Sequence, residues 1–102
     1  QPGFDKTEIS DSAYRLCTDE KTDPAVRITA LQVCAKLGKR EILPFARETI
    51  RKSNDVPLKM SAIAALGMVG EKSDAEILRT LASSSDLRLR TASEAALRKL
   101  GI

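Results

Sequence analysis

The 102-residue sequence contains no histidine and no tryptophan, and its aromatic residues are one tyrosine and two phenylalanines. Without histidine it lacks the commonest protein ligand for metals and the usual general acid–base residue of enzymes. An apolar content of 42% with so few aromatic residues favours an aliphatic helical core over a β-sandwich. The sequence has no apolar run of about 18 residues, so no membrane-spanning helix is expected. Its first residues show no signal peptide.

Cysteine is also scarce, because the chain has only Cys17 and Cys34, which do not form a Cys-x-x-Cys motif. We expect two reduced, buried thiols, since free cysteine behaves as a small apolar residue. A disulfide between them is the alternative, and it would place the protein in an oxidising, exported compartment rather than in the cytoplasm. A catalytic cysteine is disfavoured because no neighbouring base is evident. We therefore expect no enzyme activity, no cofactor and no metal site.

One sequence pattern occurs three times along the chain. It reads Asp-Pro-Ala-Val-Arg at 23–27, Asp-Val-Pro-Leu-Lys at 55–59 and Asp-Leu-Arg-Leu-Arg at 86–90. The copies are 32 and then 31 residues apart. Each opens an apolar stretch that ends at a glycine, namely Gly38, Gly70 and Gly101. An internal period of this length is typical of solenoid proteins, in which each unit packs only against its neighbours.

The repeated stretches have the apolar period of a helix. In the first copy the apolar residues fall at i, i+4, i+7, i+8 and i+11, at Val26, Ala30, Val33, Cys34 and Leu37. Each aspartate is a good N-cap, and each glycine can adopt the left-handed conformation that ends a helix. The sequence therefore predicts helices over 24–37, 56–69 and 87–100.

Second helices lie between these three. The apolar face of the first consists of Ile42, Leu43, Ala46, Thr49 and Ile50, and that of the next of Asp74, Ala75, Leu78, Leu81 and Ala82. A leading helix over 7–19 has its apolar face at Ile9, Ala13, Leu16 and Cys17.

These patterns predict an all-α, right-handed α-solenoid of antiparallel helix hairpins, with about six helices. We expect residues 1–22 to form a partial repeat or capping helix. Repeats follow at 23–53, 54–84 and 85–102, and the last of these is incomplete. We therefore expect the chain to be part of a larger protein that supplies further repeats or domains, and the last helix to keep a half-covered apolar edge.

At this level of detail the chain resembles the HEAT-like repeats named after the phycobilisome-lyase family. The resemblance rests on the Asp-Pro-x-Val-Arg opening at 23–27, the Leu-Gly ending at 37–38 and the Ile-Leu-Pro at 42–44. It implies a scaffold or protein-binding surface. Some members attach bilin chromophores, and distant relatives excise damaged DNA bases.

We expect the binding surface on the second helices, which line the concave side of such solenoids. The candidate contact residues are Tyr14, Arg47, Arg51 and Arg79. Their charge favours another protein with an acidic surface. Binding of nucleic acid or another anionic ligand is the alternative, disfavoured for nucleic acid by a net charge of only +3 and by few aromatic residues for stacking. A bilin lyase-like activity is the third interpretation.

Two further features recur in the register. The cations Arg27, Lys59 and Arg90 are expected to form ion pairs between units, with Asp23, Asp55 and Asp86 as the candidate acids. Ile28 and Met60 occupy equivalent positions on the face away from the core, where they would form a small apolar patch.

Overall fold

The computed structural model describes residues 6–101, with side chains from residue 8 onward. Within this part the chain forms six α-helices and no strand. They are α1 (Lys6–Thr18), α2 (Pro24–Lys36), α3 (Leu43–Lys52), α4 (Val56–Val69), α5 (Ala75–Ala82) and α6 (Leu87–Lys99). Two short 3₁₀ turns, η1 (Arg40–Ile42) and η2 (Lys72–Asp74), lead into α3 and α5. The predicted helices therefore agree with the observed ones to within about two residues.

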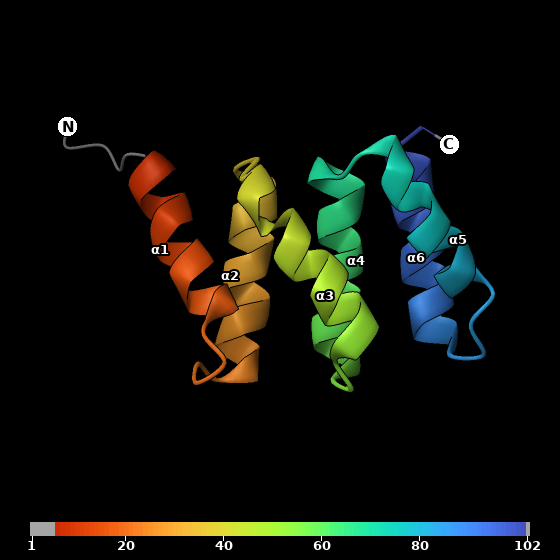
Figure 1. The fold of residues 1–102 in the computed structure, drawn as a ribbon, viewed down its shortest axis with the longest axis horizontal. Helices are drawn as coiled ribbons and strands as arrows, with labels where there is room; N and C mark the ends of the chain where they lie inside the picture. Colours follow the sequence, from red (N-terminus) through yellow and green to blue (C-terminus); the bar gives the residue numbers. More distant parts are fainter. Residues whose placement is uncertain (1–5, 102) are drawn as a thin grey trace.

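The helices form an all-α solenoid. Helices α2, α4 and α6 stand side by side in one row, and α3 and α5 lie across α4 and α6 (Figure 1). Helices α1, α3 and α5 each pack most extensively on the helix that follows, so the pairs are α1–α2, α3–α4 and α5–α6. The resulting shape is elongated, with extents of 46 × 30 × 18 Å.

The three repeated aspartates begin α2, α4 and α6, as predicted. The Asp23 carboxylate accepts a hydrogen bond from the Ala25 amide at 2.9 Å, and Asp86 accepts one from the Arg88 amide at 2.9 Å. Asp55 accepts one from the amide of Leu58 at 3.1 Å. Each carboxylate thus satisfies an amide that the first helical turn leaves free.

The glycines that end these helices act in two ways. Gly38 and Gly101 have φ angles of 73° and 78°, the predicted left-handed conformation. Gly70 has a φ of −73°, so the same prediction is wrong for it. A side chain at Gly70 is excluded instead by contact, because a Cβ there would lie 2.3 Å from the carbonyl oxygen of Leu66.

The core is centred on α4, which lies between α2, α3 and α6. Ile63 and Leu66 are completely buried there. Gly67 allows α6 to approach, since a Cβ at this position would lie 2.9 Å from the Cα of Ala96. Burial on three sides explains why apolar residues surround almost the whole circumference of α4.

The expected ladder of ion pairs between repeats is absent from residues 8–101, so that prediction is wrong. Arg27 donates instead to the carbonyl of Cys17 at 3.1 Å and lies over the ring of Phe45, 5.6 Å from its centroid. The repeated aspartates are occupied as helix caps, and Asp86 pairs with Arg88 on its own helix at 3.1 Å.

The outward face of α6, which points away from α4, is polar. The register places Glu94 where α2 and α4 have Leu31 and Ile63, and it places Arg98 where they have Ala35 and Gly67. Glu94 and Arg98 are both exposed. The expected half-covered apolar edge lies beside this polar face, because Leu97 and Leu100 are only partly buried and Leu87 at the start of the helix is exposed.

Both cysteines are free thiols in the core, at the contact between α1 and α2. The Cys17 thiol donates to the carbonyl of Tyr14 at 3.4 Å, and the Cys34 thiol donates to the carbonyl of Ser10 at 3.7 Å. The neighbouring Cys34 thiol and burial together raise the pKa of Cys17 well above its ordinary value. The same contact with Cys17 lowers the pKa of Cys34. Neither thiol is exposed to solvent, and a thiol that a reagent cannot reach is a poor nucleophile.

We therefore expect Cys17 and Cys34 to resist a thiol reagent in the native protein and both to react after unfolding. Titration with a chromogenic disulfide, with and without denaturant, measures this. A native chain about 2 Da lighter than the fully reduced mass would instead show that the two residues form a disulfide.

Candidate functional site

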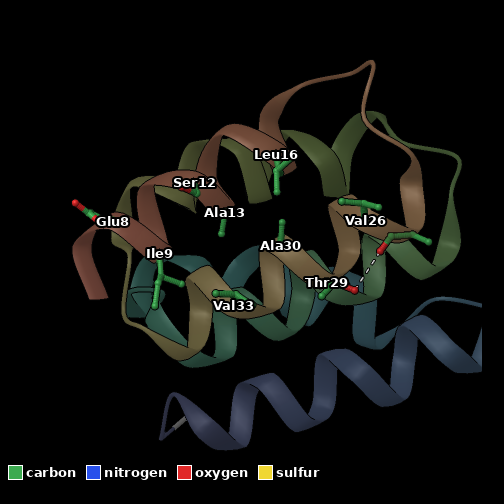
Figure 2. A pocket seen from close by; sticks show the side chains of 10 residues that line it. Glu8, Ile9, Ser12, Ala13, Leu16, Val26, Thr29, Ala30 and Val33 are labelled. Carbon is green, nitrogen blue, oxygen red and sulfur yellow. Dashed lines mark hydrogen bonds between the residues drawn. The ribbon is translucent and has the colours of Figure 1, made fainter. Parts of the chain in front are cut away.

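An open groove of about 710 Å³ lies between α1 and α2. Its walls are mainly aliphatic. Figure 2 shows Ala13 and Leu16 of α1 pointing towards Ala30 and Val26 of α2 across it. The full lining consists of Glu8, Ile9, Ser12, Ala13, Leu16, Ala25, Val26, Thr29, Ala30 and Val33.

Three residues of this groove were predicted to be core residues, and that prediction is wrong. Ile9 is 36% exposed, Leu16 is 45% exposed and Val26 is 44% exposed. In the next repeat Ile9 is equivalent to Ile42 and Val26 to Leu58, and both Ile42 and Leu58 are buried. Ile42 and Leu58 are covered because α1–α2 stacks against α3–α4, whereas no other part of residues 6–101 stacks on the opposite side of α1–α2 (Figure 1).

The polar groups of the groove are few and mostly engaged within their own helices. The Thr29 hydroxyl donates to the carbonyl of Ala25 at 3.2 Å, and the Ser12 hydroxyl accepts from Arg15 at 3.4 Å. Among the side chains that the structure describes, Glu8 is the one charged residue of the lining. Such a surface holds a ligand by apolar contact and offers no group arranged for bond-making chemistry.

Arg47, one of the four predicted contact residues, is partly buried and forms an ion pair with Asp74. Its guanidinium makes two hydrogen bonds to Asp74, at 2.7 Å to Oδ1 and 3.0 Å to Oδ2, and so joins α3 to the start of α5. The Asp74 carboxylate also accepts from the Glu71 amide at 2.9 Å. Burial opposes ionisation of Asp74, but these hydrogen bonds and the charge of Arg47 hold its pKa below the ordinary value.

The other three predicted residues lie apart from the groove lining. Tyr14 is half-buried beside Lys39, whose ammonium group lies 5.8 Å from the centre of the tyrosine ring. Arg51 and Arg79 are exposed, and neither forms an ion pair with a residue of the described chain. Sequence reasoning did not recognise the groove, because its large apolar residues, such as Leu16 and Val26, fit the apolar period of a covered helix.

Within residues 6–101 we find no group of histidine, cysteine, aspartate or glutamate side chains that could hold a metal ion. None of the helices in that range has the length and apolar character needed to cross a membrane.

Comparison with known families gives one match, to the family described as HEAT repeats, over residues 15–98. The matched region runs from Arg15, in the last turn of α1, to Arg98 in the last turn of α6. It includes the α2 wall of the groove but only Leu16 of the α1 wall. No match was found among curated proteins or among solved structures.

Proposed function

Since this chain belongs to the HEAT repeat family, we propose that it is a non-catalytic protein-binding module that engages its partner through the α1–α2 groove. HEAT repeats generally serve as scaffolds with extended binding surfaces. The observation that carries the proposal is the cluster of Ile9, Leu16 and Val26, three large apolar side chains exposed around one groove. Contiguous exposed apolar surface of this kind marks sites of protein contact.

The finer relationship we propose is to the repeats named after the phycobilisome-lyase family. It is supported by the Asp-Pro-x-Val-Arg sequence at 23–27, in which Asp23 caps α2 and Arg27 ties α2 to the end of α1. This relationship concerns the repeat type. We do not extend it to bilin attachment, because the described chain offers no general base beside its two buried thiols.

Site-specific photo-crosslinking in cells of the source organism tests the proposed function. We expect p-benzoylphenylalanine in place of Ser12, on the groove, to give discrete adducts with another protein. The same amino acid in place of Arg98, on the polar face at the other end of the chain, is the matched control and should give none. Adducts at neither position, or equal adducts at both, would contradict a binding site in the groove.

A second candidate is binding of an acidic protein or another anionic ligand across α3 and α5. It is supported by Arg51 and Arg79, which are exposed and have no ion-pair partner in the described chain. Because Arg47 is paired with Asp74, only two of the three predicted arginines are free to bind an anion, and this candidate is therefore the weaker one. A steep loss of affinity with added salt would distinguish it from apolar binding in the groove.

A further inference from the structure

We infer that a second hollow, where the end of α1 and helix α2 meet α3, binds a carboxylate that is attached to an apolar group. The hollow has a volume of about 540 Å³, within the range of about 300–1,000 Å³ that is usual for ligand sites. It shares no lining residue with the α1–α2 groove, so the inference stands or falls independently of the proposed function.

Arg27 supplies the positive charge of this site. Its Nε donates to the carbonyl of Cys17 at 3.1 Å, and its guanidinium lies over the ring of Phe45, 5.6 Å from the centroid. These two contacts fix the orientation of a partly buried side chain. A guanidinium has five N–H donors, yet within residues 8–101 only Nε forms a hydrogen bond and no carboxylate lies within 4.0 Å. The two terminal nitrogens are therefore available to a ligand.

Thr49 supplies a second polar group in the same lining. It is only 6% exposed, and its hydroxyl forms no hydrogen bond with the part of the chain that the structure describes. The equivalent residues of α1 and α5 are Leu16 and Leu81, so packing alone does not require a hydroxyl here. Because buried hydroxyl groups are normally hydrogen-bonded, Thr49 indicates a ligand with an acceptor oxygen at this place.

The other charges of the lining favour a ligand with a single negative charge. Lys52 and Glu48 pair with each other at 3.5 Å, and Glu20 is exposed. Of the two cations in the described lining, only Arg27 is therefore without an acidic partner. A phosphate dianion would be repelled by the carboxylates of Glu20 and Glu48, whereas a carboxylate carries one charge.

The shape of a carboxylate also suits the site. Its two oxygens match the paired N–H groups of a guanidinium, and one of them can also accept from a hydroxyl such as that of Thr49. The partly buried ring of Phe45 offers apolar surface to the carbon atoms that bear the carboxylate. Such a ligand is either a small organic acid or the free C-terminus of a protein that ends in an apolar residue.

Titrations of the 102-residue chain, followed by two-dimensional NMR of its backbone amides, test the inference. The probes are phenylacetate, a hexapeptide ending in a free leucine carboxylate, the neutral amide of each, and inorganic phosphate. We expect at least one of the two acids to shift the amides of Arg27 and Thr49 with a Kd below about 5 mM. The tighter of the two acids identifies the source of the ligand. Equal binding of an acid and its amide, binding of neither acid, or phosphate binding as tight as that of the acids would overturn the inference.

Three variants show whether the acid binds to the residues named here. Thr49→Val removes the hydroxyl at nearly constant shape and should weaken binding about fivefold, the effect of one hydrogen bond. Arg27→Gln should weaken it at least about tenfold. Arg90→Gln is the matched control, because Arg90 occupies the register position of Arg27 on α6, is exposed and lies outside the lining.

Thr49→Val leaves the contacts of Arg27 with Cys17 and Phe45 in place, so it tests the site even where Arg27→Gln prevents folding. Circular dichroism of each variant shows whether it is folded. Unchanged affinity in folded Thr49→Val or Arg27→Gln would overturn the inference, and so would an equal loss in Arg90→Gln.

Discussion

Replacement of Leu66 by alanine is expected to lower the free energy of unfolding by about 2–5 kcal/mol. Leu66 is fully buried in α4, the helix that contacts α2, α3 and α6. Its removal takes apolar contacts from the centre of the stack and leaves a cavity that the surrounding helices cannot all close at once. Domains of this size are usually stable by about 5–15 kcal/mol, so the loss would be a large share of the total.

Met68 provides the matched control on the same helix, because it is 43% exposed. Met68→Ala should change the free energy of unfolding by less than about 1 kcal/mol. Urea denaturation of both variants, followed by circular dichroism in the α-helical band at about 222 nm, measures the difference. A loss below about 1 kcal/mol for Leu66→Ala would show that the central helix is not packed as described here.

The helices could be predicted because their signals are local. An aspartate such as Asp23 caps the turn that directly follows it, and the apolar period then determines which face of the helix is buried. The repeated register supplied the remaining information, since it identified equivalent positions in units that share little sequence. Helix α1 aligns with α3 at a shift of 33 residues, which makes Ile9 equivalent to Ile42, and its predicted bounds of 7–19 differ from the observed Lys6–Thr18 by one residue at each end.

The groove could not be predicted in this way, because burial depends on a neighbour as well as on the residue itself. Val26 and Leu58 occupy the same slot in the register, yet Val26 is exposed and Leu58 is buried. The period of α2 is the same with or without a helix pair stacked against it. The polar face of α6, by contrast, could have been predicted from the sequence. Glu94 and Arg98 are charged, whereas the equivalent residues of α2 and α4 are apolar or small.

The ion pair between Arg47 and Asp74 could not be predicted for another reason. In the register Asp74 is equivalent to the buried apolar residue Ile42. A buried carboxylate at this position needs a neighbouring cation. The cation that reaches Asp74 is determined by the position of α5 relative to α3, and the spacing of residues in the sequence does not give this position. The structure shows that the arginine chosen as a surface contact is the one that neutralises the buried acid.

Substitution of Arg47 by methionine, which keeps an apolar stem but removes the charge, is therefore expected to destabilise the protein. The variant leaves the buried Asp74 carboxylate with only the Glu71 amide as partner, and breaking a buried pair in this way is costly. We expect a loss of about 2–4 kcal/mol at pH 7, moderated because about a third of the Arg47 side chain is exposed to water. Arg79→Met, at an exposed arginine of α5, is the control and should cost less than about 0.5 kcal/mol.

The pH dependence of this loss separates the ion pair from simple packing. The pKa of Asp74 is depressed in the folded wild type, so the stability it contributes is present above the unfolded pKa of about 3.9 and is lost as the pH falls through the folded value. In Arg47→Met, protonation of Asp74 instead relieves a buried, unpaired charge. The difference in unfolding free energy between the two proteins should therefore narrow as the pH falls below about 4. Urea titrations of both proteins between about pH 7 and pH 3 measure this difference, and a constant value across that range would mean that the pair contributes no electrostatic stability.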